Sequence, residues 1–213
     1  MAAALSLWLR DGGNAPQFVF QLLIYPWLQS FDLNLPSMHL NERVPYDIIT
    51  KEGMAKSTLT YLNESLEYTS ELMTNSHTTP NMRQRYSSLV DWNLIPKHMV
   101  PKSYTRPRNQ GNIKLAEKLE EDMTNPYIFP LMADDLSDLP PAFVWTVESD
   151  CLRDEGIIFA KRMEKDGGIV EHYHDLHGWH GMISFLEGPL KMDAGVKGTD
   201  AIVQFADAHY KDN

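Results

Sequence analysis

A continuous apolar run between two prolines places the strongest constraint on how this 213-residue chain folds. Residues 17–25, which contain FVFQLLIY, lie between Pro16 and Pro26 and show little polar alternation. Strands covered on both faces, as in parallel sheets, have this near-continuous apolar pattern. A helix is predicted just before it, over residues 2–10. Helix and buried strand together indicate an α/β unit.

Predicted strands and helices alternate again after a long polar segment. The expected elements are a loop over 27–45, a helix over 46–62, short helices and loops in the proline-interrupted segment 63–125, a strand over 142–147, a helix over 153–165, a strand over 169–174, a loop with Gly178 and Gly181, and a helical segment within 193–210. We therefore expect one α/β domain with a mostly parallel sheet. The segment 63–125 is predicted to be a lid-like insertion.

Charge and composition exclude several functions. The net charge is −10 and the basic residues form no stripe, so a nucleic acid partner is not expected. No apolar run approaches the roughly 18 residues that indicate a membrane span. Cys151 is the one cysteine, which excludes an internal disulfide and metal sites built from clustered cysteines.

Titratable residues follow two consecutive predicted strands, the position at which open α/β sheets bind ligands. Asp150 comes after the first strand, in VESDCLRDEG, and His180 after the second, in HDLHGWHGMISF. Neighbouring strand ends lie about 5 Å apart, so one hydrogen bond can join the two side chains. An imidazole held by a carboxylate activates a serine nucleophile, and the order Asp then His is that of α/β-hydrolases.

Other roles remain open for these residues. Asp150 also suits a cap of the following helix, and Asp154 suits a cap or a partner of the helix dipole. A histidine-rich loop can bind zinc, but no cysteine or carboxylate set completes a ligand pattern here. The histidines concerned are His172, His174, His177 and His180.

DCLRDEG followed by GWHGMISF resembles the arylacetamide deacetylase and neutral cholesteryl ester hydrolase family, within the hormone-sensitive-lipase-like esterases. LIYPWLQSFDLNLPS, DWNLIPKHMVP and NPYIFPLMADDLSDLPPAFV are similar to further segments of that family, so the resemblance runs through nearly the whole chain. It implies an α/β-hydrolase fold, with Asp150 as the triad acid and His180 as the base. His177, in His-Gly-Trp, is the runner-up for the base.

The same resemblance implies that the amino-terminal half of the fold is missing. No G-x-S-x-G pattern occurs, and MAAAL at the start is similar to the family sequence a few residues after its nucleophile. Ser149 and Ser184 do not sit on a strand-turn-helix elbow, so neither is expected to replace that serine. We expect a carboxylic ester hydrolase segment that is inactive alone. The alternative is a non-catalytic interaction or regulatory fragment.

The family resemblance also implies the partners. The expected substrate of the full-length parent is a small-molecule ester or a lipid, and no cofactor or metal is expected. For the full-length parent, the resemblance implies association with the endoplasmic reticulum membrane. The acyl and alcohol groups of the substrate are not encoded in any motif of this sequence.

Overall fold

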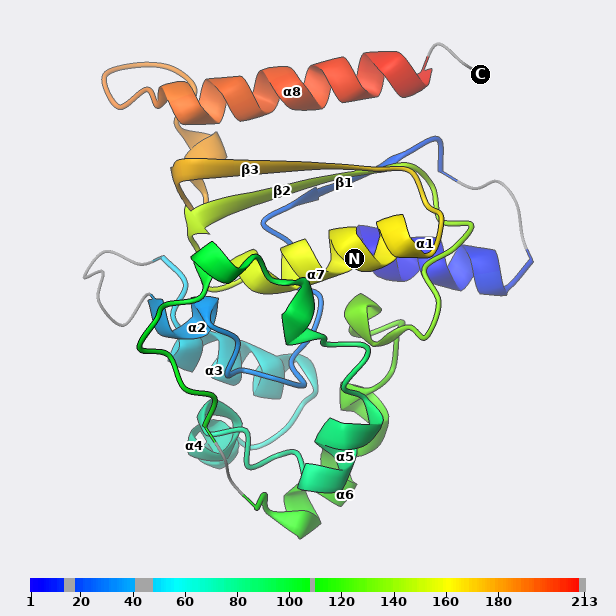
Figure 1. Cartoon of the computed structure of the whole chain (residues 1–213), viewed down its shortest axis with the longest axis vertical. Helices are drawn as coiled ribbons and strands as arrows, with labels where there is room; N and C mark the ends of the chain where they lie inside the picture. The colour runs from blue at the N-terminus through cyan, green and yellow to red at the C-terminus, as the bar shows by residue number, and fades with distance from the viewer. Residues whose placement is uncertain (14–17, 41–47, 108–109, 211–213) are drawn as a thin grey trace.

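Three parallel strands form the centre of the structure, a computed structural model (Figure 1). The structure describes residues 1–13, 18–40, 48–107 and 110–210. The strands pair side by side in the order β1 (Gln21–Ile24), β2 (Ala142–Ser149) and β3 (Val170–Trp179). The predicted α/β class with a parallel sheet is confirmed.

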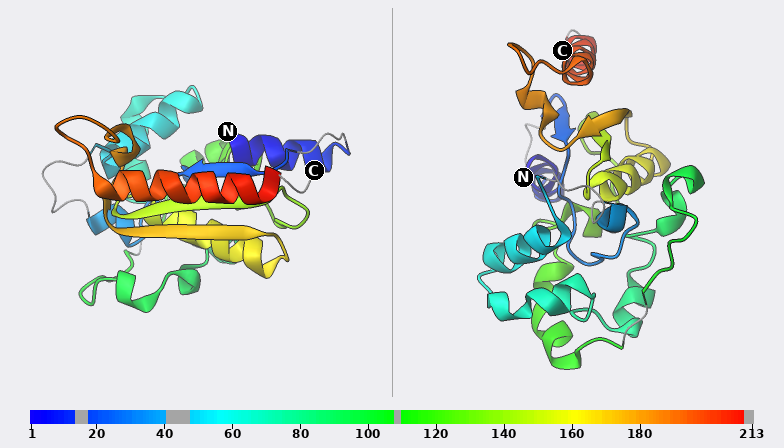
Figure 2. Two further views of the ribbon diagram at one scale, coloured as in Figure 1. Left: turned by 90° about the horizontal axis from the view of Figure 1, so that it is seen from above. Right: turned by 90° about the vertical axis from the view of Figure 1, so that its left-hand side faces the viewer.

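Helices cover both faces of this sheet. Helices α1 and α7 lie on one face, whereas α8 runs across the other (Figures 1 and 2). The remaining helices belong to the long segment between β1 and β2. The helices are α1 (Ala2–Asp11), α2 (Ser37–Leu40), α3 (Lys51–Tyr61), α4 (Thr69–Met73), α5 (Pro80–Arg85), α6 (Ile113–Met123), α7 (Arg153–Lys165) and α8 (Asp193–Tyr210).

Two glycines let helices approach β2 from opposite faces. A Cβ added to Gly156 of α7 would lie 2.6 Å from Thr146 Cγ2. One added to Gly198 of α8 would lie 2.0 Å from Trp145 Cζ2. Both distances are far below van der Waals contact, so any side chain at either position would push the helix away from the sheet.

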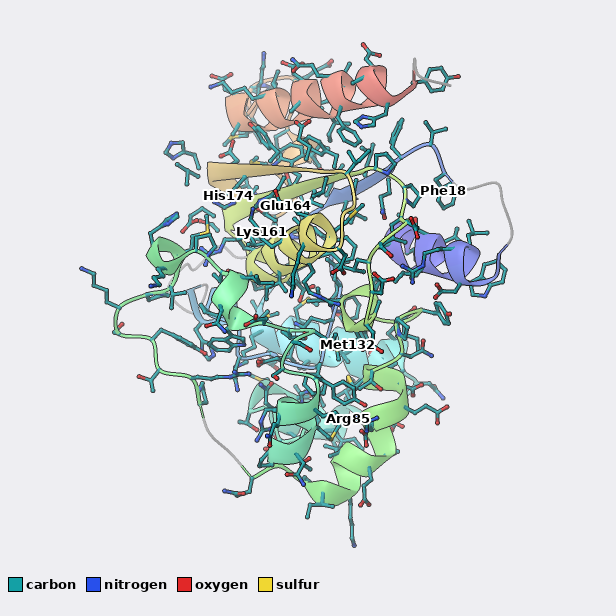
Figure 3. The ribbon with its side chains drawn as sticks, turned by 45° about the vertical axis from the view of Figure 1, so that its right-hand side comes forward. Phe18, Arg85, Met132, Lys161, Glu164 and His174 are labelled. Carbon is teal, nitrogen blue, oxygen red and sulfur yellow. The ribbon has the colours of Figure 1, made fainter. Side chains whose placement is uncertain are left out.

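Helix α7 is buried along most of its length. Its outer side carries an ion pair between Lys161 Nζ and Glu164 Oε2 at 2.8 Å (Figure 3). Among the described helices, none combines the length and the apolar composition that crossing a bilayer requires.

The first strand is shorter than the apolar run predicts. Strand β1 begins at Gln21, and Phe18 and Val19 before it are exposed. Its partner β2 begins at Ala142, directly after Pro140 and Pro141, which have no N–H to donate to a ladder. The ladder therefore starts opposite Ala142. Residue 17 lies outside the described part of the chain.

The last strand is longer than predicted. Strand β3 continues past residue 174 to Trp179, so Gly178 lies in the strand and not in a loop. Gly178 is buried, and an added Cβ would lie 2.7 Å from Val147 Cγ1 and from Met182. This position therefore has no room for a larger side chain. The predicted helix at 46–62 is α3, which begins at Lys51, and residues 46 and 47 are outside the described ranges. The predicted loop at 27–45 contains α2.

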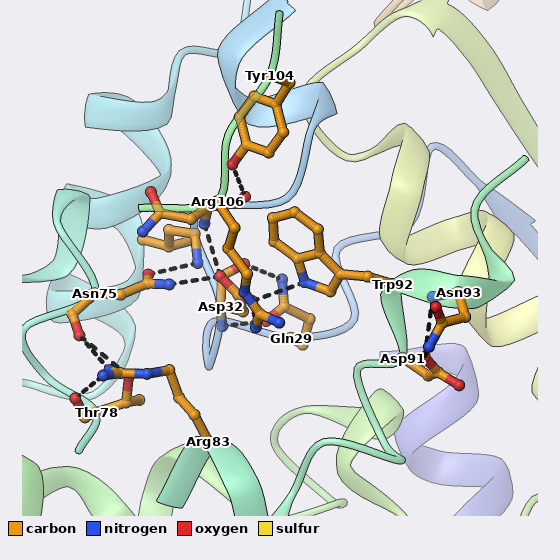
Figure 4. A network of polar contacts seen from close by, with 12 residues as sticks. Gln29, Asp32, Asn75, Thr78, Arg83, Asp91, Trp92, Asn93, Tyr104 and Arg106 are labelled. Carbon is orange, nitrogen blue, oxygen red and sulfur yellow. Dashed lines mark hydrogen bonds and ion pairs between the residues drawn. The ribbon is translucent and has the colours of Figure 1, made fainter. Parts of the chain in front are cut away.

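A buried carboxylate organises the segment that follows β1. Asp32 Oδ1 accepts hydrogen bonds from Asn34 N and Asn75 Nδ2, and Oδ2 accepts from Trp92 Nε1 and Arg106 Nη2 (Figure 4). The Arg106 guanidinium lies 4.2 Å from the centre of the Trp92 ring. One side chain thus joins four parts of the chain between β1 and α6.

Candidate active site

Asp150 is the first residue after β2, and its carboxylate is almost fully buried, with 1% of the residue exposed. Its Oδ1 atom accepts a 2.9 Å hydrogen bond from Leu152 N. Leu152, not Asp150, is the residue that caps α7. The cap interpretation is therefore only partly right: Asp150 orders the turn before α7 with one oxygen and leaves the other for a second partner.

That second partner is His180. His180 Nδ1 lies 2.8 Å from Asp150 Oδ2, across 30 residues of sequence. Because a carboxylate accepts, Nδ1 carries the proton and Nε2 presents its lone pair. Within the described residues, Nε2 makes no hydrogen bond. The structure thus brings together the two residues that the sequence places after consecutive strands.

Tyr25, which the sequence did not single out, packs against the imidazole. Its ring centre lies 5.2 Å from that of His180 and 5.2 Å from that of Trp145. Its φ of +49° lies in the left-handed region, where a bulky side chain costs about 1–3 kcal/mol. No sequence signal predicts it, because the residue before a proline is expected in the extended region at negative φ.

A cavity of about 420 Å³ opens beside His180. Its walls are mostly apolar, and the described side chains that line it include no carboxylate, lysine or arginine. The lining residues are Tyr25, Trp27, Ile48, Ile49, Thr50, Gly53, Met54, Ser57, Leu152 and His180. These residues come from the end of β1, from α3 and the residues just before it, and from the segments that follow β2 and β3. None of them belongs to the segment 63–125. The role of that segment as a lid stays a prediction.

The other histidines have separate partners. His172 Nε2 and His174 Nδ1 both contact Thr146 Oγ1, at 2.8 and 2.9 Å. Burial lowers the pKa of His172 to about 4 and also lowers the pKa of His174. His177 is exposed on β3 and no contact joins it to Asp150. In the described part of the chain, no group of three or more His, Cys, Asp or Glu residues is placed to hold a metal ion.

Three consecutive charged residues at the start of α7 are buried and bind three different segments. Arg153 Nη2 donates to Met99 O at 2.9 Å, and Asp154 Oδ2 accepts from Ser37 N at 2.7 Å. Glu155 Oε1 accepts from Leu28 N at 2.5 Å. Asp154 lies in the first turn of α7, as the sequence predicts, and its side chain also anchors the chain after β1.

The described serines near this pair do not form a nucleophile–base contact. Ser149 ends β2, Ser184 is exposed in a turn after β3, and Ser57 lies on α3 at the cavity wall. No hydrogen bond joins any of these three hydroxyls to His180. A serine in a working triad makes that contact with the base.

Comparison with known proteins supports an α/β-hydrolase fold. A family model described as alpha/beta hydrolase fold matches residues 98–184, which include Asp150 and His180. Human arylacetamide deacetylase-like 4 is 31% identical over 207 residues, covering 95% of this chain and 50% of that protein. Neutral cholesterol ester hydrolase 1 of Bos taurus is 29% identical over 214 residues, covering 97% and 52%. Along nearly its whole length, the chain is similar to members of the arylacetamide deacetylase and neutral cholesterol ester hydrolase family.

Solved structures support the same fold for this family segment. The thermostable carboxylesterase EstE1 from a metagenomic library superposes with a TM-score of 0.59 at 20% identity, over 97% of this chain and 50% of EstE1. A Rhizomucor miehei esterase gives a TM-score of 0.59 at 21% identity, over 100% and 49%. At these identities the likeness concerns the fold alone. The chain spans about half the length of the relatives that it matches.

Proposed function

We propose that this chain supplies the acid and the base of a serine carboxylesterase, with Asp150 as the acid and His180 as the base. The observation that carries the proposal is the 2.8 Å contact between His180 Nδ1 and the buried Asp150 Oδ2. The His180 ring lines a mostly apolar cavity, and its Nε2 atom makes no hydrogen bond with the described residues. The exposed His177, which lacks this carboxylate contact, is not the base.

In this reaction a serine hydroxyl attacks the ester carbonyl carbon. His180 Nε2 takes the hydroxyl proton, and Asp150 holds the tautomer and stabilises the imidazolium that forms. The imidazolium then gives its proton to the leaving alcohol. A water molecule, deprotonated by the same nitrogen, hydrolyses the acyl-enzyme. No step requires a metal or a cofactor.

The nucleophile is not among the serines that this chain places near His180. We infer that the 213-residue chain alone does not turn over esters, and that the reaction needs a serine from sequence beyond these residues. The substrate of the complete protein is a small-molecule ester or a lipid ester. The cavity supports an uncharged group on the substrate, because the described residues that line it include no carboxylate, lysine or arginine.

The test uses a longer form of the protein that carries a G-x-S-x-G serine, assayed with a short p-nitrophenyl ester. His180→Ala should lower kcat by about 10⁴-fold or more, since loss of a triad member removes its acid–base chemistry. His177→Ala is the matched control and should retain near-normal kcat. Near-normal turnover in His180→Ala would remove this assignment.

A further inference from the structure

Side chains along β1 alternate between the two faces of the sheet, as in any strand. Leu23 packs into the core beneath α1 and α7, whereas Leu22 and Ile24 pack with the second cluster, which includes Phe205 of α8. By this alternation Tyr25 belongs with Leu23. Instead it lies in the same cluster as Ile24.

The backbone of Tyr25 explains this reversal. Its φ of +49° turns the chain into the left-handed region, although its N–H still donates to Trp145 O at 2.9 Å as the strand ladder requires. The other described non-glycine residues with positive φ are Asn63, Asn75 and Asp138, the residue types that tolerate this conformation. An aromatic residue does not, so the surrounding structure must hold it there.

The strained conformation places the Tyr25 ring against His180. The two ring centres are 5.2 Å apart with the planes tilted by 51°, and Trp145 backs the Tyr25 ring at 5.2 Å. A single hydrogen bond from Nδ1 to Asp150 leaves the imidazole free to rotate about its own side-chain bonds and so to break that contact. A ring packed against the imidazole removes this freedom, because the rotation would drive the two rings together.

We propose that Tyr25 is a positioning residue that holds the His180 imidazole in the orientation in which Nδ1 donates to Asp150 Oδ2. The proposal rests on the acid–base role of His180 proposed above. Burial, with a further contribution from the charge of Asp150, raises the pKa of Tyr25, so the phenol stays neutral and acts through its shape. A core residue without this role would follow the alternation of β1 and avoid the strain.

The experiment follows the His180 ring by NMR in the 213-residue chain, through the downfield proton signal of the Nδ1–H that Asp150 accepts. His180→Ala identifies the signal by removing it. Tyr25→Phe keeps the ring and should keep the signal. Tyr25→Leu and Tyr25→Met remove the ring, and in both the signal should disappear while the amide spectrum remains that of the folded chain.

Phe205→Leu is the matched control, because it truncates a buried aromatic of the same cluster that makes no ring contact with His180. It should retain the signal. Persistence of the signal in the folded Tyr25→Leu or Tyr25→Met chain, or an equal loss in Phe205→Leu, would overturn the proposal. The measurement needs no turnover, so a failure of the Tyr25 proposal can be distinguished from a failure of the esterase assignment. The kcat of His180→Ala tests the latter.

Discussion

Glu155 Oε1 accepts a hydrogen bond from Leu28 N at 2.5 Å, although the two residues lie 127 positions apart. The second oxygen, Oε2, accepts from Gln29 Nε2 at 2.9 Å. One carboxyl group of α7 therefore holds the chain where it leaves β1, beside Tyr25. Burial raises the pKa of Glu155 to about 8, and the hydrogen bonds from Leu28 and Gln29 oppose this rise.

This raised pKa predicts how stability depends on pH. Between its ordinary pKa of 4.5 and about 8, Glu155 keeps its proton in the folded chain and loses it in the unfolded chain. The contribution of Glu155 to the free energy of unfolding is therefore fully present below pH 4.5. It is lost as the pH rises through 8, and the loss is about 5 kcal/mol at most. Glu155→Gln should flatten this fall, measured by urea unfolding at several pH values.

Glu164→Gln on the outer side of the same helix is the control. The hydrogen bond from Lys161 lowers the pKa of Glu164, so this group titrates below the window in question. Its substitution should leave the slope of stability against pH unchanged between about pH 5 and pH 8. Equal slopes in the wild type and in Glu155→Gln would contradict the prediction.

The Asp32 network predicts an asymmetry between its two charged members. Asp32→Ala leaves the buried amide of Asn75 and the partly buried N–H of Trp92 without an acceptor and should destabilise the chain by about 3–5 kcal/mol. Arg106→Ala should cost less, about 1.5–3 kcal/mol, because three other donors still hold Asp32 and water can enter the space left by the half-exposed Arg106 side chain. Urea unfolding of both variants measures the difference. Similar losses would show that Arg106 and not the buried donors carries the network.

Gly198→Ala should loosen α8 from the sheet. Alanine is favoured in a helix by about 1 kcal/mol, but its methyl group would overlap the rigid Trp145 ring, at a cost of about 1–3 kcal/mol or more. The control is Gly53→Ala in α3, where an added Cβ meets a side-chain oxygen of Thr50 at 3.2 Å. Thermal unfolding should show the lower midpoint for Gly198→Ala. A midpoint at or above that of Gly53→Ala would mean that α8 adjusts freely.

A fluorophosphonate probe tests the location of the nucleophile. The 213-residue chain should not be labelled, since no described serine near His180 contacts the imidazole. Ser57 deserves a separate variant, because it lines the same cavity. Stoichiometric labelling that Ser57→Ala abolishes would identify a nucleophile within this chain. Binding of a protein partner without any labelling or turnover would instead favour an interaction fragment.

Much of this architecture could be predicted from hydrophobic pattern, because the segments that form β2 and α7 are buried on nearly every side. The adjacency of Asp150 and His180 follows from the same pattern, since both come directly after neighbouring parallel strands. Their catalytic roles stay predictions. The start of β1 could not be predicted from its own residues, because Pro141, just before the partner strand, limits the ladder.

Two features of the candidate site depend on tertiary structure alone. Two-residue periodicity assigns Tyr25 to the face of Leu23, and a single backbone angle reverses that assignment. The carboxyl group of Glu155 follows a helix start, where a solvated charge is the usual interpretation. Its burial depends on Leu28 and Gln29, which follow β1 and come close to α7 because β1 pairs with β2.

The position of β2 between two strands and two helical layers also affects local opening. Its backbone amides should be among the last in the chain to exchange with deuterated solvent, because their exposure requires nearly complete unfolding. Strand β3 has a partner on one side alone among the described strands, so it should open at lower free energy. Asp150 and His180 therefore follow strands of unequal local stability. Local opening of β3, which carries His180 away from Asp150, should separate the pair first.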